Sequence, residues 1–305
     1  MRIGINGSSL IALNRPVSEL VDHAVEAERD GFSSYWLAQL AVPDALTVLG
    51  AVGLQTTTIE LGTAVIATWL RHPLMLAAQA LTVSDMAKGR VLLGIGLAHK
   101  TTIEERLRIP FAQPAKHMEE YLDVLLPALK ERAVDATGEI WSGSADSVGG
   151  PPDVASPQVM LAAMGPRMLE LAGQRTDGNI LWLSGPRTIE TVIAPAMAKG
   201  AAAAGRQPGR IVASVPVCVT DKPDEVRGLI AAFLSGYNDL PSYRGVMDIE
   251  GVDGPAGVSI VGDEKAVHDG IQSFADAGTT DFTPVEFALD DEARARTRAL
   301  LKSLL

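Results

Sequence analysis

Residues 59–99 read IELGTAVIATWLRHPLMLAAQALTVSDMAKGRVLLGIGLAH, and this stretch decides the fold. An apolar, β-branched run at 59–67 leads through a Trp-Leu-Arg-His-Pro turn into a helix, whose apolar residues between 74 and 81 recur at helical spacing. A second apolar run follows at 91–97. Strand, helix and strand with short connections form a βαβ unit, so we expect two parallel strands joined by a right-handed crossover.

The same alternation continues through the rest of the chain. Strand-like runs occur at 2–6, 33–39, 59–67, 91–97, 159–164, 178–184, 211–220 and 281–287. Helical segments separate these eight runs, a pattern typical of a (β/α)8 TIM barrel more than of a doubly wound sheet. Because no linker divides the 305 residues, we predict a single domain over 1–305.

Two connections are longer than this alternation needs. Residues 100–157, after the fourth strand, carry a helical pattern and then a run rich in Gly, Ser, Asp and Pro at 135–157, for which we expect a loop or an irregular hairpin. Residues 237–257 form a second insertion, after the seventh strand. We expect both insertions at or near the face of the barrel that would hold a cofactor, because long connections in compact domains are often functional.

The composition restricts the partners. A net charge of -11 and a pI near 4.9 argue against nucleic acid or an anionic membrane surface, because both need a basic face. No segment approaches the length of apolar chain that crosses a membrane. The start MRIGING lacks the layout of a signal peptide, and a single cysteine, Cys218, excludes an internal disulfide, so we expect a cytoplasmic protein.

In a (β/α)8 barrel the active site lies at the carboxyl ends of the strands. There, Gly94 and Gly96 are expected to let a ligand approach the backbone. Four larger side chains are predicted to gather at the same edge: Trp69, Arg71, His72 and His99. The other strand ends contribute Asn6, Gln39, Thr68, Leu97, Met164, Ser184, Thr220 and Glu286.

The sharpest motif follows the fifth strand, where residues 162–167 read Ala-Ala-Met-Gly-Pro-Arg. A Gly and a Pro at a strand-to-helix junction expose backbone N–H groups that bind phosphate, and Arg167 can add a charge-assisted hydrogen bond. The same residues are equally compatible with a plain turn whose arginine is solvated.

His99 ends the fourth strand, where an imidazole can act as an acid, a base or a hydrogen-bond donor near a cofactor. A structural role is the alternative. The other four histidines show no metal-ligand spacing, so we expect no metal site. Gly94-Ile95-Gly96 lacks the third glycine of a dinucleotide fingerprint, and neither a P-loop nor a G-x-S-x-G motif is present.

Several of these motifs resemble those of a known family. Residues 62–100 resemble the segment of bacterial-luciferase-like proteins in which a strand, an R-x-P turn and a helix precede a strand beginning GR-x-x-x-G-x-G. Residues 162–195, 216–227 and 237–251 resemble the branch that uses the deazaflavin coenzyme F420, the actinobacterial F420-dependent oxidoreductases.

The resemblance implies a (β/α)8 barrel that holds F420 in its mouth and exchanges hydride at the C5 carbon of the deazaflavin. It also implies a bulged third strand with a non-proline cis peptide at Ala64-Val65, and a cofactor phosphate on the turn 165–167. The cofactor-binding residues implied in this way are Gln39, Thr63, Ala64, Val65, Thr68, Gly96, Leu97, Ala98, Ala163, Met164, Gly165, Pro166, Arg167 and Ser184.

The sequence also departs from one branch of the family. Members that oxidise a sugar phosphate have a glutamate after the Gly-x-Gly strand and a histidine at the end of the second strand, where this chain has His99 and Leu40. The presumed catalytic base of those members is therefore missing, and basic residues for a sugar phosphate are not evident.

An apolar mouth instead favours a small, uncharged, unsaturated organic substrate. Its predicted residues, which are equally compatible with packing roles, are Trp36, Leu40, Trp69, Leu97 and Met164. Three functions remain open: hydride transfer with F420 with His99 as the catalytic group, monooxygenation with FMN, and binding of F420 without catalysis. The sequence also leaves open whether the chain acts as a monomer or as a homodimer.

Overall fold

The computed structural model describes residues 1–39 and 42–305. Its main sheet has the strand order β1-β14-β11-β10-β9-β6-β4-β3-β2, and its strand pairs are parallel. β1 (Arg2–Ile3) and β2 (Ile5–Asn6) are two parts of one strand. Because β1 pairs with β14 and β2 pairs with β3, the sheet closes on itself. The predicted TIM barrel is confirmed.

The described barrel strands agree with the predicted runs, and four of those runs, including 2–6, are divided in two. The strands after β2 are β3 (Ser34–Leu37), β4 (Glu60–Thr63) with β5 (Ile66–Ala67), β6 (Val91–Gly96), β9 (Gln158–Leu161), β10 (Gly178–Trp182), β11 (Arg210–Ser214) with β12 (Pro216–Val219), and β14 (Asp281–Phe282) with β15 (Val285–Glu286). A further strand, β13 (Ile260–Gly262), pairs with β12 and was not predicted, because three residues are too short for a recognisable alternation.

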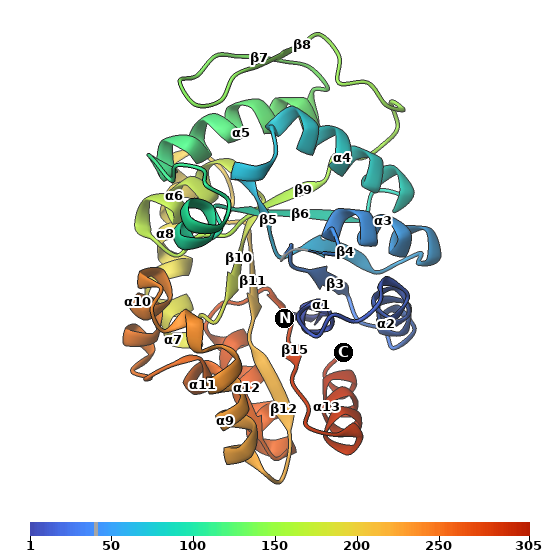
Figure 1. Ribbon diagram of the computed structural model, residues 1–305, viewed down its shortest axis with the longest axis vertical. Coiled ribbons are helices and arrows are strands. Elements are labelled where there is room, and N and C mark those ends of the chain that lie inside the picture. The colour runs from blue at the N-terminus through green and yellow to red at the C-terminus, as the bar shows by residue number, and fades with distance from the viewer. Residues whose placement is uncertain (40–41) are drawn as a thin grey trace.

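Helices cover the outside of the barrel (Figure 1). They are α1 (Ser8–Ala12), α2 (Val17–Arg29), α3 (Ala45–Gln55), α4 (Pro73–Met86), α6 (Pro166–Arg175), α7 (Pro186–Thr188) continuing through a π-helical turn (Ile189–Ile193) into α8 (Ala194–Ala203), α9 (Pro223–Phe233), α12 (Glu264–Asp276) and α13 (Asp291–Ser303). Three begin at an aspartate whose carboxylate accepts a backbone N–H of the first turn: Asp44, Asp263 and Asp290.

The first insertion contains a π-helical turn (Thr102–Arg106), α5 (Pro114–Lys130) and an antiparallel hairpin of β7 (Val134–Ala136) and β8 (Gly143–Ala145). Figure 1 shows this hairpin lying outside α4 and α5. The Glu120 carboxylate holds the turn by accepting the backbone N–H groups of residues 139–141. Burial would raise the pKa of Glu120, but these hydrogen bonds outweigh it and lower the pKa. The hairpin interpretation of 135–157 is thus confirmed.

The second insertion folds into helices. It contains a 3₁₀ turn (Ser235–Tyr237), α10 (Pro241–Glu250) and α11 (Pro255–Val258). These elements share a second hydrophobic cluster with α9 and with the end of β10, including Leu183, Ile230 and Met247. The insertion therefore rests on the carboxyl end of the sixth barrel strand.

The inside of the barrel has its own apolar cluster, formed by Trp36, Leu92, Met160, Ile180 and Val212. Trp36 is fully buried there, and its ring occupies the space that a Cβ of residue 62 would need, so the glycine at that position is required. The prediction that Trp36 lines the apolar mouth is therefore wrong. Its side chain points into the barrel because period-two alternation places Trp36 on the inner face of β3.

The third strand is interrupted between β4 and β5, and the peptide bond Ala64-Val65 is cis. The bulge and the cis peptide that the resemblance implied are confirmed. Two nearby glycines pack closely against this bulge. A Cβ on Gly94 would lie 1.9 Å from the Thr63 carbonyl oxygen, and one on Gly96 would lie 2.9 Å from the Val65 side chain. Both glycines are therefore required by the close approach of the bulge.

Within the part of the chain that the structure describes, we find no helix with the length and apolar character that crossing a bilayer requires.

Candidate active site

The candidate site is the mouth of the barrel, where the carboxyl ends of the strands meet the two insertions. His99 follows β6 and is half-buried. Its imidazole meets two aromatic rings of the second insertion edge-on, with centroid distances of 5.8 Å to Tyr237 and 5.7 Å to Tyr243. Burial lowers the pKa of His99 below its usual value, so the ring is neutral at pH 7.

The two tyrosines belong to an aromatic wall made of Tyr237, Tyr243 and Trp182. Tyr237 and Tyr243 pack at 4.7 Å, and Trp182, the last residue of β10, lies 6.5 Å from Tyr237. Burial raises the pKa of both phenols, so they remain neutral. Sequence reasoning missed this wall. The Tyr-Arg-Gly run of 243–245 was visible, but nothing in the sequence placed that insertion over His99.

Trp69 lies in a different aromatic group, at the end of the third strand. Its indole stacks on the His117 imidazole at 3.7 Å and contacts Phe111 at 5.2 Å. His72 meets Trp141 of the hairpin at 5.6 Å, and its Nε2 lies 3.0 Å from the Ser142 carbonyl oxygen. The predicted gathering of Trp69, Arg71, His72 and His99 is thus divided, since His99 packs against the other insertion.

Several predicted cofactor residues hold the strand ends in place. The Thr63 hydroxyl donates to the Gly94 carbonyl, and the Thr68 hydroxyl donates to the Gly96 carbonyl. The Gln39 side-chain oxygen accepts the Ala45 N–H and so joins the second strand to α3. Leu40, the other predicted residue of this connection, lies outside the described residues.

Ser184 is fully buried, and among the described residues its hydroxyl has no hydrogen-bond partner. It follows β10 and precedes Gly185, whose open side is covered by the Glu250 carboxylate of α10. Glu250 also accepts the Thr188 N–H at 2.6 Å. The helix beginning at residue 186 is therefore already capped by an acid, which disfavours an anion there.

The turn after β9 is different. Gly165 precedes α6 as its N-cap residue without a side-chain cap. Among the described residues, apart from its chain neighbours, no atom lies within 4 Å of the position that a Cβ would take there. Arg167 is 69% exposed and its guanidinium is bound to the Glu119 carboxylate of α5 at 2.8 Å. Met164 packs against the second hydrophobic cluster, and the Ala163 carbonyl accepts the side-chain N–H of Asn179. This helix terminus is open to an anion.

Glu286, the remaining candidate for an acid or base, lies away from the mouth. Its carboxylate pairs with Arg298 of α13, beside His23 of α2, on the outside of the barrel. Burial would raise the pKa of Glu286, but the bonds from Arg298 outweigh it and lower the pKa to about 2. Held by Arg298 between two outer helices, this carboxylate has a structural role.

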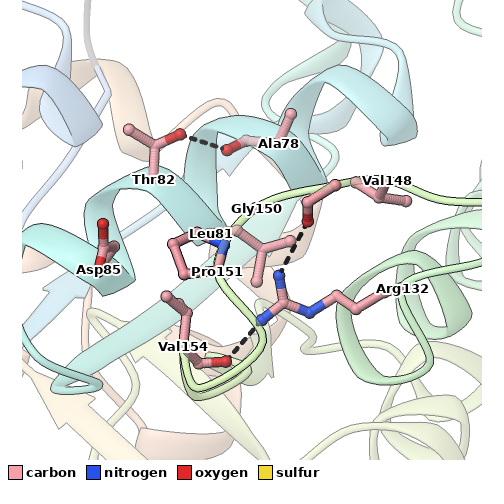
Figure 2. Close-up of a pocket in the computed structure, with 10 residues that line it drawn as sticks. Ala78, Leu81, Thr82, Asp85, Arg132, Val148, Gly150, Pro151 and Val154 are labelled. Atoms are coloured by element: carbon pink, nitrogen blue, oxygen red, sulfur yellow. Dashed lines mark hydrogen bonds between the residues drawn. The ribbon is translucent and has the colours of Figure 1, made fainter.

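A hollow of about 190 Å³ lies on the outer face, between α4 and the loop 148–154 (Figure 2). Its one arginine, Arg132, donates to the carbonyl oxygens of Gly149 and Val154 and so holds the loop (Figure 2). Because the Arg132 guanidinium is already hydrogen-bonded to backbone carbonyl groups, we do not include this hollow in the site.

A family model described as luciferase-like monooxygenase matches residues 4–281. Among curated relatives, a 5,10-methylenetetrahydromethanopterin reductase of Methanolobus tindarius is 27% identical over 296 residues, covering 94% of this chain and 87% of the relative. An uncharacterised protein of Mycobacterium tuberculosis is 28% identical over 264 residues, covering 82% of this chain and 76% of the relative.

Solved structures agree on the fold. The F420-dependent tetrahydromethanopterin reductase of Methanopyrus kandleri superposes with a TM-score of 0.83 at 21% identity, covering 99% of this chain and 97% of that one. An F420-dependent secondary alcohol dehydrogenase superposes with a TM-score of 0.80 at 18% identity, covering 100% of this chain and 98% of that one. The FMN-bound oxygenating component of 3,6-diketocamphane monooxygenase of Pseudomonas putida superposes with a TM-score of 0.75 at 19% identity. The match covers 99% of this chain and 96% of that one. With the family model matching most of its length, this chain belongs to the luciferase-like monooxygenase family.

Proposed function

We propose that this protein is an F420-dependent oxidoreductase that transfers hydride between coenzyme F420 and an uncharged organic substrate. The observation that carries the proposal is the mouth itself, where a neutral, half-buried His99 faces an aromatic wall. The F420-dependent enzymes among the structural neighbours and the reductases among the relatives support the choice of cofactor.

The residues present fit a flat cofactor with a phosphate tail. The open amino end of α6 at Gly165 suits the phosphate, since helix N–H groups attract anions. The buried Ser184 hydroxyl, unpartnered among the described residues, is available to a polar edge of the ring system. When bound, F420 supplies a site that accepts or donates hydride, and the protein supplies binding, orientation and a proton partner.

His99 is the proton partner in this proposal. A neutral imidazole accepts a proton, so for an alcohol substrate His99 takes the hydroxyl proton as the carbinol C–H bond breaks and the carbonyl forms. In the reverse direction the protonated ring returns that proton to the carbonyl oxygen. Tyr237 and Tyr243 keep water and charge away from the imidazole, which holds its pKa low.

The substrate is expected to be uncharged and apolar. The wall offers aromatic faces and neutral phenols. The amino end of α7, which could otherwise attract an anion, is already occupied by the Glu250 carboxylate. An anionic substrate would be repelled by that carboxylate. We therefore expect turnover with small alcohols, enones or imines rather than with phosphorylated sugars.

The test is turnover with F420 across a panel of alcohols, enones and imines, followed by the absorbance of the deazaflavin. We expect at least one class to oxidise or reduce the cofactor catalytically. Binding of F420 without any turnover on the panel would favour a non-catalytic F420-binding protein. The FMN-bound neighbour supports a second function, an FMN-dependent monooxygenase, which oxygen consumption with reduced FMN and the same panel would reveal.

Replacing Arg167 by Ala should weaken F420 binding by about 1 to 3 kcal/mol, the cost of losing a hydrogen bond to a charged group. Arg175→Ala is the matched control, because Arg175 lies on the same helix and also pairs with an acid of α5, Asp123, but at the far end from Gly165. Titration of both variants at low salt measures the difference. Equal affinities would mean that the turn after β9 is a plain connection.

A further inference from the structure

His117, in the first turn of α5, links the hairpin to the ends of two barrel strands. The Trp141 indole N–H donates to His117 Nδ1 at 3.1 Å, and His117 Nε2 lies 2.8 Å from the Thr68 hydroxyl. The Thr68 hydroxyl lies 3.3 Å from the Gly96 carbonyl oxygen. We call these four residues, Trp141, His117, Thr68 and Gly96, the His117 chain. His117 itself is fully buried.

The chemistry of the end groups fixes every proton in the His117 chain. An indole N–H can only donate, so Nδ1 of His117 must present its lone pair to Trp141. The proton of the neutral imidazole is then on Nε2 and is donated to the Thr68 oxygen, which leaves the Thr68 proton for the Gly96 carbonyl. An imidazolium would direct a second N–H at the indole N–H, so the chain requires the neutral ring.

Burial lowers the pKa of His117 to about 4, with the Glu120 carboxylate opposing that shift. Glu120 acts weakly because its oxygens are engaged by the backbone of residues 139–141 and by Lys116. The neutral ring is therefore the form that exists at neutral pH, in agreement with the bond pattern.

The His117 chain begins where the backbone pairing of two strands ends. The ladder between β5 and β6 stops at the pair Ala67 and Gly96, and the next residue, Thr68, turns into a 3₁₀ helix. Its hydroxyl continues the connection to Gly96 in place of a backbone N–H. The same imidazole stacks on Trp69 at 3.7 Å, so one ring fixes both the strand ends and an indole of the mouth.

We propose that His117 is a positioning residue for hydride transfer: as a neutral ring protonated at Nε2, it holds Thr68, Gly96 and Trp69 in the arrangement that the cofactor needs, and Trp141 of the hairpin fixes that ring. The inference rests on the proposed function, because Thr68 and Gly96 are among the cofactor-binding residues that the family resemblance implies. It gives the hairpin a part in the reaction although the hairpin lies outside the barrel (Figure 1).

Trp141→Phe tests the proposal, because it keeps an aromatic ring and removes only the N–H donor. Tyr121→Phe is the matched control. The Tyr121 ring stacks on His117 at 5.9 Å, and its hydroxyl donates to the Arg71 carbonyl. The control therefore keeps the ring and also removes one hydrogen bond from the same cluster, but none of the hydrogen bonds of the His117 chain. We expect kcat with F420 to fall about tenfold in Trp141→Phe and to stay at the wild-type value in Tyr121→Phe, because small misplacements of reacting groups are costly. The two variants should show similar losses in Tm.

Nitrogen-15 NMR of the imidazole gives a second readout that needs no cofactor. We expect wild-type His117 to carry its proton on Nε2 and to remain neutral from pH 5 to 8, and Trp141→Phe to lose that fixed tautomer. A wild-type proton on Nδ1, or equal kcat values in the two variants of an active enzyme, would overturn the positioning role while leaving the proposed function intact. An inactive wild-type protein would refute the proposed function, and the inference with it, even if the NMR result held.

Discussion

His99→Ala is expected to lower kcat by about 10²- to 10⁴-fold, the usual contribution of a positioned acid or base, while F420 binding stays nearly unchanged. The reason is that His99, which follows β6, packs against the aromatic wall as a neutral imidazole and can exchange a proton there. Steady-state kinetics combined with an F420 titration separates the two effects. Equal losses of binding and turnover would make His99 a cofactor-binding residue instead.

The control and the pH profile sharpen this prediction. His268→Ala removes an exposed histidine of α12 and should leave kcat unchanged. Because burial lowers the pKa of His99, the wild-type enzyme should oxidise an alcohol with a rate that falls only as the pH drops below the usual histidine range. His99→Ala should lose that acidic limb, and wild-type kinetics in this variant would make His99 structural.

Arg298→Ala is expected to lower the free energy of unfolding by about 3 to 5 kcal/mol, the range for breaking a buried ion pair. Arg298 pairs with Glu286 and with Asp30, and all three side chains are at most 15% exposed. Its removal leaves two carboxylates without that partner, between the last helix and α2. Urea unfolding at pH 7 measures the loss. Arg294→Ala, on the same helix but in an exposed pair with Asp291, should change stability by less than about 1 kcal/mol.

The pH dependence of this loss has a defined sign. The pKa of Glu286 is lowered in the folded protein to about 2, from 4.5 when unperturbed, so its ionisation stabilises the fold fully above pH 4.5. That contribution is lost as the pH falls toward 2. The difference between wild type and Arg298→Ala should therefore shrink on acidification below pH 4.5. A difference that is constant from pH 7 to 3 would mean that the ionisation of Glu286 does not contribute to this loss.

The architecture could be predicted because it depends on local patterns. The stretch 59–99 contains two strands and a helix whose periodicity and Gly and Pro signals are all within a few residues of one another. The strand-to-helix junction predicted at 162–167 coincides with the start of α6, because Pro166 fixes that start. The short strand β13 and the helices of the second insertion were missed, because tertiary contacts with β12 and α9 stabilise them more than their own sequence does.

The site could be predicted only in part, because a sequence does not show which way a strand-end side chain points. Trp36 and Glu286 were both candidates at the mouth, yet one fills the barrel and the other faces α13. His99 was identified from its place after the fourth strand. Its partners Tyr237 and Tyr243, more than a hundred residues away in sequence, came into view only with the fold.

The most direct test of the central claim is a parallel absorbance titration of the purified protein with F420 and with FMN. We predict saturable binding of F420, weakened by Arg167→Ala but not by Arg175→Ala, and markedly weaker binding of FMN. Saturable binding of FMN with no spectral response to F420 would contradict the account and identify the protein as a flavin-dependent member of the family.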